Sequence, residues 1–407
     1  MHTVIYIGNF KTGLMDAQCQ LVLGNCRILA QLGYQPVLIG NDSALANPTD
    51  PLASRKMLSG FPCYNIAFSK SIGDLLHIRN IHKQIEAILS HYGPSIDAVI
   101  TYGTPTFGIE LRWLKQWCTR HNALFLANVV DLPVTCHGTI PERIIKTLDR
   151  RIVERTIINH ADGIIAVSEY IDRFYRKYTD VPTVILPPLK DTHELPQPVF
   201  REDGITRIVY IGVPFPLDGR KMEEDAYKDR IDLFIDLLCS IRNQVPACRL
   251  DLYGLTREQY LNTISRHIPL LEEHGDILHF HGRISHDDSL KCFAEADFSV
   301  LFRIKNRMTM AGFSSKLVES ISCGTPVILT DTSDCLSYLT DGETCFLLDS
   351  ENLPGSRERL AEVLNLSRQD IRQRKQQCYT ARIFDYQNYT EKMEQFLQQL
   401  QKNTPET

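Results

Sequence analysis

The feature that most constrains the fold is an alternation of short apolar segments with longer amphipathic segments along almost the whole chain. Thr3–Gly8, Asp97–Tyr102 and Leu124–Val130 are apolar runs with the length of buried strands. Between them lie stretches with apolar residues at helical spacing, such as Leu14–Leu32, which ends at Gly33. Strands and helices that alternate in this way form a parallel sheet with helices on both faces. The sequence therefore predicts an α/β fold.

A proline-rich segment interrupts this alternation near the middle of the chain. Pro187–Phe200 holds four prolines and shows no periodicity, and a second series of strands and helices follows it. At 407 residues the chain is also longer than one ordinary hydrophobic core supports. We predict two doubly wound domains, residues 1–190 and 205–380, joined by a linker at residues 191–204. Residues 381–407 would form a C-terminal helix that packs back on the first domain.

Composition and charge exclude several classes of protein. The hydrophobic content of 43% and charged content of 23% are ordinary globular values, and the net charge of −5 gives no general reason to expect nucleic-acid binding. The 12 cysteines include no C-x-x-C pair, and the chain runs directly into its first strand without a charged leader. No apolar run approaches the roughly 18–20 residues that span a bilayer. We therefore expect a soluble cytoplasmic protein.

The stretch Arg303–Pro326, RIKNRMTMAGFSSKLVESISCGTP, has the clearest features of a binding site. It follows the apolar run Asp297–Phe302 and passes through the small-residue turn Ala311-Gly312 into an amphipathic segment. Open α/β sheets bind ligands at the carboxyl ends of their strands, and the free N–H groups of a helix start attract anions. Lys316 and Glu319 lie near this helix start, three residues apart and hence on one face. The arrangement suits a nucleoside diphosphate.

Several well-known motifs for cofactors and catalysis are missing from the sequence. No G-x-G-x-x-G follows the first strand, and neither a Walker motif, a G-x-S-x-G elbow nor a D-x-D pair occurs. His279 and His281 alternate on a predicted strand, with His274 and His286 nearby, and a metal site there is one interpretation. Histidines that meet solvent or backbone at a strand end are the simpler one. We therefore expect neither a metal nor a bound cofactor.

Three segments of the second half match a known family in the right order. They are RIVYIGVP followed by Tyr227-Lys228-Asp229, then ILHFHGRISHDDSLKCFAEADFSVLFR, then AGFSSKLVESISCGTPVILTDTSD followed by YLTDGETCFLL. Together they resemble the nucleotide-binding half of family 4 glycosyltransferases, and more narrowly a bacterial surface-glycan subgroup. The first half matches less specifically, with IIAVSEYI near its end. The resemblance implies the GT-B arrangement, in which two Rossmann-like doubly wound domains face each other across a cleft.

The resemblance also implies an activity and a set of donor-binding residues. The enzyme would move a sugar from a nucleotide-diphosphate donor, UDP- or GDP-linked, to a hydroxyl of a glycan or lipid-linked acceptor, with retention and without a metal. Glu319 would accept hydrogen bonds from the ribose hydroxyls, although an ion pair with Lys316 is the alternative. Many relatives have another glutamate eight residues earlier, where this chain has Ala311, so the family's two-glutamate model does not transfer. The other donor-binding residues that we predict are Gly13, Gly212, Gly312, Phe313, Ser314, Ser315 and Lys316.

Three charged residues are the candidates for catalysis. Lys228, at the start of a helix, and Arg303, at the end of a strand, would stabilise the departing diphosphate. A solvated lysine and a structural salt bridge are their respective alternatives. Asp131 follows a strand at a position where many relatives have a histidine, and it would orient a sugar hydroxyl or accept the acceptor's proton, or else cap a turn. His137 is a weaker candidate, with an ordinary loop histidine as the alternative.

Several other segments each allow two interpretations. Arg220 and Lys221, in a long polar loop, would either reach phosphate or be solvated, and Gly13 would either border the ligand or form a tight turn. The basic helix Pro141–His160 would either touch the inner face of the plasma membrane, as related enzymes do, or be a solvated mixed-charge face. Two alternatives to a transferase are a GT-B nucleotide-sugar epimerase and a non-catalytic partner of another glycosyltransferase.

Overall fold

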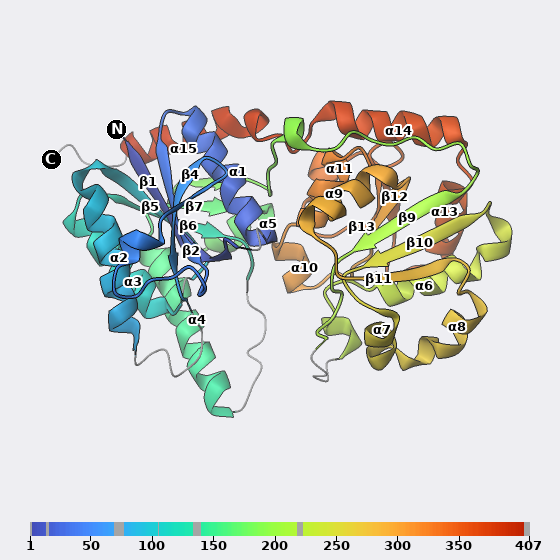
Figure 1. Cartoon of the computed structure of the whole chain (residues 1–407), viewed down its shortest axis with the longest axis horizontal. Coiled ribbons are helices and arrows are strands. Elements are labelled where there is room, and N and C mark those ends of the chain that lie inside the picture. Colours follow the sequence, from blue (N-terminus) through green and yellow to red (C-terminus); the bar gives the residue numbers. More distant parts are fainter. Residues whose placement is uncertain are drawn as a thin grey trace. The chain divides into compact units, whose positions relative to one another are not determined.

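The chain folds as two compact units, which Figure 1 shows with their helices and strands labelled. The computed structural model describes residues 2–13, 16–68, 77–104, 106–132, 140–217 and 223–402. The first unit is Met1–Leu189 with Tyr386–Thr407, and the second is Lys190–Asp385. Residues 191–204, the predicted linker, therefore belong to the second unit. They are held there by contacts such as that of the Thr192 N–H with the Asp385 carboxylate, 3.1 Å away.

The first unit is built on an eight-stranded sheet with the order β3-β4-β2-β1-β5-β6-β7-β8. The strands are β1 Thr3–Lys11, β2 Gln35–Asn41, β3 Lys56–Leu58, β4 Phe61–Ile66, β5 Ile96–Tyr102, β6 Leu124–Val129, β7 Gly163–Ala166 and β8 Thr183–Ile185. Neighbouring strands run parallel except the edge pair β3 and β4, which is antiparallel. Strands β3, β4 and β8 were not predicted, since none of them has the long apolar run that identifies a central strand.

The helices of the first unit come from both ends of its sequence. They are α1 Ala17–Gln31, α2 Ile78–Tyr92, α3 Gly108–Arg120, α4 Ile140–His160, α5 Glu169–Tyr175 and α15 Thr390–Lys402, with the 3-10 turns η1 Pro51–Ser54, η3 Gly93–Ser95 and η8 Tyr386–Tyr389. The C-terminal helix α15 packs on β7, where a Cβ added to Gly163 would lie 2.8 Å from atoms of Phe396 and Leu400. Thr390 also donates a hydrogen bond to Gln31 of α1, at 3.0 Å. Helix α15 thus completes the first unit.

The second unit has a six-stranded, wholly parallel sheet with the order β11-β10-β9-β12-β13-β14. The strands are β9 Thr206–Ile211, β10 Cys248–Tyr253, β11 Leu278–Gly282, β12 Phe298–Leu301, β13 Val327–Thr330 and β14 Cys345–Leu348. Within this sheet β9 comes first in the sequence, and β10 and β11 are added on one side of it. The chain then crosses back to β12, which lies on the other side of β9. The carboxyl ends of β9 and β12 therefore flank the point at which the strand order reverses, where open α/β sheets bind their ligands.

Helices cover both faces of this second sheet. They are α6 Ile231–Ser240, α7 Arg257–Thr263, α8 Ile268–Glu273, α9 His286–Glu295, α10 Arg307–Ala311, α11 Ser315–Ser322, α12 Cys335–Tyr338, α13 Leu353–Leu364 and α14 Arg368–Ala381, with η4 Thr192–Glu194, η5 Glu224–Ala226, η6 Arg242–Gln244 and η7 Ser265–His267. The stretch Glu258–Glu273, which the sequence alone would suggest as one helix, is divided into α7 and α8, because Pro269 in the first turn of α8 has no N–H to continue a helix.

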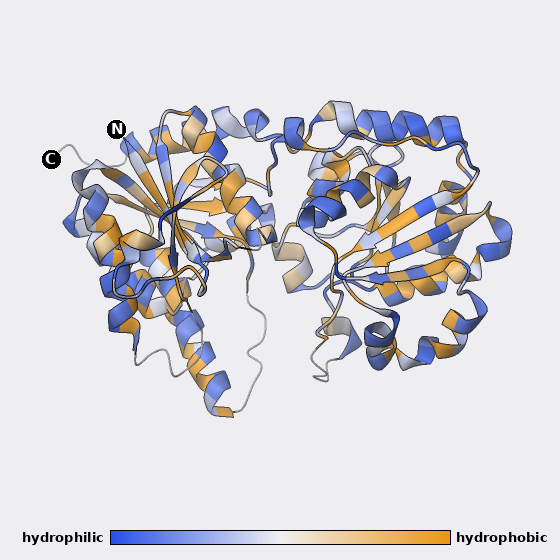
Figure 2. Cartoon of the chain, viewed as in Figure 1, coloured by the Kyte–Doolittle hydropathy of each residue, from blue (hydrophilic) through white to orange (hydrophobic). Residues whose placement is uncertain are grey.

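The cores of the second unit lie between these helices and the sheet. On one face Phe234, Tyr260 and Leu360 pack with Phe298 of β12. On the other face α11 and α14 pack through side chains that include Val318. Figure 2 shows the pattern behind this arrangement, with hydrophobic strands and hydrophilic outer helix surfaces. The burial of apolar surface from both faces holds the carboxyl ends of the strands in place.

Candidate functional site

The site of the second unit is formed where β9 and β12 end. Gly212 follows β9 and has a φ of +148°, a backbone conformation that favours glycine. A Cβ added there would lie 2.5 Å from Nζ of Lys316, which comes from the first turn of α11. Lys316 Nζ also lies 4.6 Å from the ring centroid of Tyr210 on β9. Glycine at position 212 therefore leaves the space that the ammonium group occupies.

A buried carboxylate, Asp229, organises the charges of this site. It is 1% exposed, and it accepts hydrogen bonds from Arg303 Nε at 2.7 Å and from the Tyr210 hydroxyl at 2.8 Å. Lys316 Nζ donates to the same oxygen, Oδ2, as Tyr210. Burial acts to raise the pKa of Asp229, but the charges of Lys316 and Arg303 outweigh it and hold this pKa well below its usual value. The carboxylate is therefore ionised and fixes two cations.

The three predicted cations of this unit meet around Asp229. Lys228 is exposed and precedes it directly, and its charge also contributes to the lowered pKa of the aspartate. Arg303 is 3% exposed and pairs with Asp229 through Nε, which is the salt-bridge alternative stated for it. The Lys316 side chain is 22% exposed and that of Arg303 is 4% exposed. Of the two cations bound to Asp229, Lys316 therefore has the greater access to a ligand. Burial lowers the pKa of Lys316, and Asp229 opposes that shift.

Glu319 is the second buried carboxylate of the site, one turn along α11 from Lys316. It is 7% exposed, and its Oε1 accepts from Lys190 Nζ at 2.8 Å and lies 3.0 Å from His286 Nε2. Burial acts to raise the pKa of Glu319, but Lys190 and then His286 outweigh it and lower this pKa to about 2. The carboxylate thus pairs with Lys190 and His286, and not with Lys316 as the alternative interpretation had it.

The residues that lead into α11 serve partly the fold and partly the site. Gly312 ends α10 through a hydrogen bond of its N–H with Met308 O, at 3.1 Å. Phe313 packs edge-on against Tyr338 and Phe384, with ring centroids 5.4 and 5.9 Å apart. Ser314 occupies the N-cap position of α11, and Ser315 is the first residue of the helix. Phe313 therefore anchors the loop in the core.

Ser314 differs from its neighbours because its hydroxyl is buried without a hydrogen-bond partner among the described residues. The residue is 5% exposed, and its Oγ does not cap the helix that it precedes. A buried polar group without a partner costs free energy unless a water or a ligand binds it. The start of α11 therefore combines free backbone N–H groups, an unused hydroxyl and the ammonium of Lys316, all of which suit an anion.

The predicted residues of the first unit lie after its strands β1 and β6. Gly13 is exposed, and a Cβ added to it would lie 2.5 Å from Asp42 Oδ2. Asp131 is also exposed. The pKa of Tyr102 on β5 is raised, mainly by the burial of that tyrosine and next by the negative charge of Asp131. Because β1 and β6 run parallel, with β5 between them, both positions lie at the carboxyl edge of the sheet. His137, Arg220 and Lys221 lie outside the described residues.

The histidines considered as metal ligands have other partners. His281 Nε2 lies 2.7 Å from Asp251 Oδ1, and His279 Nε2 lies 3.2 Å from the carbonyl of Asp276. His286 contacts Glu319. Within the part of the chain that the structure describes, no group of three or more histidine, cysteine and acidic side chains is placed to hold a metal ion.

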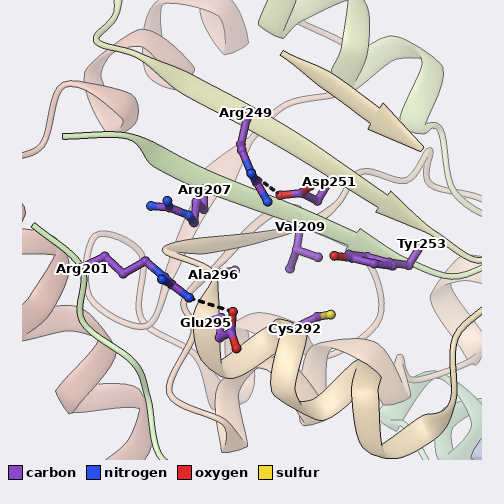
Figure 3. A pocket seen from close by; sticks show the side chains of 9 residues that line it. All are labelled: Arg201, Arg207, Val209, Arg249, Asp251, Tyr253, Cys292, Glu295 and Ala296. Atoms are coloured by element: carbon purple, nitrogen blue, oxygen red, sulfur yellow. Dashed lines mark hydrogen bonds and ion pairs between the residues drawn. The ribbon is translucent and has the colours of Figure 1, made fainter. Parts of the chain in front are cut away.

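A cavity of about 200 Å³ lies between α9 and the strands β9 and β10, as Figure 3 shows. Its lining residues are Arg201, Arg207, Val209, Arg249, Asp251, Tyr253, Cys292, Glu295 and Ala296. Each arginine already has an acidic partner: Arg201 pairs with Glu295 at 2.9 Å, Arg249 with Asp251 at 2.7 Å, and Arg207 with Asp203 at 2.5 Å. The charges of the cavity are thus balanced within the protein, and it has no excess charge for a ligand.

Sequence reasoning missed four residues that shape the candidate site. Tyr210, Asp229, Lys190 and His286 all bind the predicted residues Lys316, Arg303 or Glu319. Asp229 follows Lys228 directly in a segment that resembles the family, and His286 is one of several histidines near a predicted strand. The pair itself was the available signal for Asp229. For Lys190 no local signal existed, because its partner lies 129 residues along the chain.

A family model matches the part of the chain that contains most of this site. Residues 222–382 match the family described as glycosyl transferases group 1. The matched range holds Asp229, Arg303, Lys316 and Glu319, and it covers less than half of the chain. Lys190 and Gly212 lie before it. No curated protein sequence matches the chain.

Solved structures match both units of the chain. Sucrose-phosphate synthase from Thermosynechococcus elongatus aligns with a TM-score of 0.71 and 18% identity, over 99% of this chain and 100% of that one. The Anabaena protein HepE, in complex with UDP and glucose, aligns with a TM-score of 0.64 and 13% identity, over 98% of this chain and 100% of that one. The catalytic domain of starch synthase IV from Arabidopsis thaliana, bound to ADP and acarbose, aligns with a TM-score of 0.68 and 10% identity, over 98% of this chain and 99% of that one.

The chain has the GT-B fold. At these identities the likeness concerns the fold alone, and it confirms the predicted pair of α/β domains with parallel sheets. The antiparallel edge strand β3 of the first sheet is the one departure from parallel order among the described strands. The GT-B fold places a ligand-binding edge on each domain, at the carboxyl ends of the strands.

Proposed function

We propose that this GT-B protein is a retaining glycosyltransferase that takes a sugar from a nucleotide diphosphate and passes it to a hydroxyl of a glycan or lipid-linked acceptor. The observation that carries the proposal is the pair of buried carboxylates, Asp229 and Glu319, on either side of Lys316 at the start of α11. The family match over residues 222–382 supports a sugar transfer. The UDP in the HepE complex supports uracil as the first base to test.

The residues of the second unit suit the parts of a nucleoside diphosphate. The helix start, the Ser314 hydroxyl and the Lys316 ammonium would bind the phosphates, and Glu319 would accept hydrogen bonds from the ribose diol. Asp229 holds Lys316 in place before the donor arrives, so that the charge is oriented in advance. Cations fixed in this way stabilise the negative charge that develops on a leaving diphosphate, because little reorganisation is needed when the bond breaks.

With retention, the acceptor hydroxyl would attack from the side on which the diphosphate leaves. The leaving phosphate would then take the proton of that hydroxyl, and no dedicated base would be required. Asp131 of the first unit would orient a sugar or acceptor hydroxyl, and Lys228 would add a further cation for the diphosphate. This route needs neither a metal nor another cofactor.

The donor site is tested by binding of nucleotides to the full chain. We expect UDP or GDP to raise the melting temperature, because a ligand that binds only the folded state stabilises it. Glu319→Ala should weaken binding of that nucleotide about 10- to 100-fold, as expected for a lost hydrogen bond to a charged group. Glu258→Ala, at an exposed position of α7, is the control and should bind like the wild type. Titration calorimetry measures both affinities.

Three results would contradict the proposal in different ways. No response of the wild type to UDP, GDP or ADP and their sugars would remove the donor site. Conversion of a UDP-sugar to its epimer, without release of UDP, would identify an epimerase instead. Binding without any transfer or hydrolysis of a donor sugar, for every acceptor class supplied, would favour a non-catalytic partner protein.

We propose further that α4 rests on a membrane with anionic lipids, which fits a lipid-linked acceptor. Ile140, Ile144 and Leu148 are 74%, 56% and 51% exposed and recur every four residues, so they share one face of the helix. Arg151 and Arg155 are also exposed and lie two turns beyond Ile144 and Leu148 on that face. Figure 2 shows hydrophobic and hydrophilic residues mixed along this helix. Apolar residues beside arginines are typical of helices that lie in a membrane surface.

Vesicle flotation tests this membrane contact. The wild type should bind vesicles that contain phosphatidylglycerol, and bind less at high salt, since the arginines are attracted to the anionic lipid. The double variant Ile144→Ser/Leu148→Ser should lose most of this binding, whereas Ile268→Ser, at an exposed residue of α8, should not. Equal flotation of the wild type and the double variant would contradict the contact. Among the described residues, every helix is too short or too polar to cross a membrane.

A further inference from the structure

We infer that Lys190 and His286 are positioning residues, which hold the Glu319 carboxylate so that one of its oxygens faces the ligand. The inference rests on the proposed function, because it concerns the ribose end of the proposed nucleotide. Both residues contact the same atom, Oε1, at 2.8 Å for Lys190 Nζ and 3.0 Å for His286 Nε2. Within the described residues no hydrogen bond or ion pair reaches Oε2. A carboxylate that is hydrogen-bonded by two side chains through one oxygen has its other oxygen fixed in a defined direction.

The burial of the pair makes Lys190 more than an incidental surface contact. Lys190 is 4% exposed and Glu319 is 7% exposed. An isolated buried carboxylate would take up a proton, and a protonated one accepts hydrogen bonds from hydroxyls less well. The two neighbours keep Glu319 ionised, with a pKa of about 2. The ionised form is the one that makes strong, charge-assisted contacts with a pair of hydroxyl groups.

The backbone of Lys190 is itself held in place. Lys190 is the first residue of the second unit, and its N–H donates to the carbonyl of Phe384, at 3.0 Å. It forms a parallel bridge with Asp385, the last residue of that unit. Lys190 therefore lies where the chain enters and leaves the second unit, while its side chain reaches the site. It also lies outside the range that the family model matches, so that match assigns it no role.

His286 holds Glu319 from another direction. It is the first residue of α9, and Ser285 caps this helix by accepting a hydrogen bond from the Asp288 N–H at 3.1 Å. Its side chain is 28% exposed, in contrast to that of Lys190 at 5%. A change at His286 therefore disturbs the core less than a change at Lys190. The two positions together separate an effect on the ligand from an effect on folding.

The test compares UDP with 2′,3′-dideoxy-UDP, which lacks both ribose hydroxyls, by titration calorimetry on the full chain. Lys190→Met and His286→Leu should each weaken UDP binding about 10- to 100-fold, the range for hydrogen bonds to charged groups. Both variants should bind the dideoxy analogue like the wild type, within about twofold, because it makes no contact with Glu319. His286→Gln, whose amide can donate in place of Nε2, should restore most of the UDP affinity.

Lys375→Met is the matched control for a buried lysine. Lys375 is 1% exposed in the same unit, but it donates to backbone carbonyls of Ala294 and Ala296, so its loss should leave the ratio of the two affinities unchanged. Equal losses for UDP and the dideoxy analogue, or no loss for either, would overturn the positioning role while the donor site stands. A wild type that binds neither UDP nor GDP would instead overturn the proposed function and this inference with it.

Discussion

Replacing Lys316 with methionine should lower the rate of sugar transfer about 100- to 1,000-fold, the effect of removing one fixed donor that stabilises a developing negative charge. Methionine keeps most of the length of the side chain and removes the ammonium group. Asp229 would still pair with Arg303, so the second unit should keep its fold. Because the charge matters most when the diphosphate leaves, kcat should fall more than the affinity for UDP.

Initial rates of UDP release, measured for the wild type and for Lys316→Met with the donor and acceptor that the wild type uses, quantify this effect. Lys291→Met is the control, since Lys291 lies on the exposed side of α9 and, among the residues that the structure describes, pairs only with Asp288, at 3.1 Å. It should retain the wild-type rate. Lys316→Arg should not restore activity, because Gly212 leaves space for a single ammonium beside its backbone. A Lys316→Met enzyme within a fewfold of the wild-type rate would rule out this lysine as the main cation.

Replacing Asp229 with alanine should cost the second unit about 3–5 kcal/mol of stability, the usual loss when one partner of a buried ion pair is removed. The cost is high because Arg303 and Lys316 would both lose the carboxylate that neutralises them. Transfer activity should fall as well, since Lys316 would no longer be held over the Tyr210 ring. Urea unfolding at pH 7, followed by far-UV circular dichroism, measures the loss of stability.

The pH dependence of this stability follows from the lowered pKa of Asp229. Its folded pKa lies below the unfolded value of 3.8, so the folded state binds fewer protons than the unfolded state in that range. The stabilisation is therefore complete above about pH 4 to 5 and is lost as the pH falls toward the folded pKa. The difference between the wild type and Asp229→Asn should shrink below pH 4. A constant difference down to pH 3 would contradict an ionised Asp229.

The sequence predicted the elements that carry Lys316 and Glu319 more closely than it predicted the residues that support them. Lys316 and Glu319 were predicted because they lie in a strand–loop–helix pattern with a readable order, and Gly212 because it lies in a segment that resembles the family. Arg303 was identified as a cation at a strand end, and the structure pairs it with Asp229. The role of Asp229 was not predicted, because a buried aspartate and a solvated one look alike in a sequence.

The domain boundaries show the same difference. A proline-rich stretch with no periodicity is typical of a linker, yet residues 191–204 are part of the second unit, anchored in part by Asp385 near the end of that unit. The second unit ends at Asp385, five residues beyond the predicted boundary at 380, and the chain returns to the first unit at Tyr386. Such anchoring depends on residues nearly 200 positions away, which no local pattern reports.

The sequence by itself determined what depends on near neighbours: the alternation of strands and helices, the α/β class, and the loop before Ser315 that leads into the helix with Lys316 and Glu319. Apolar spacing and turn residues act within a few positions, so they can be read directly. Only the tertiary structure decided which charges meet. Lys190 reaches Glu319 across 129 residues, and Asp229 joins Arg303 across 74. Those partners depend on the order of strands in the sheet, because strand order brings together residues that are distant along the chain.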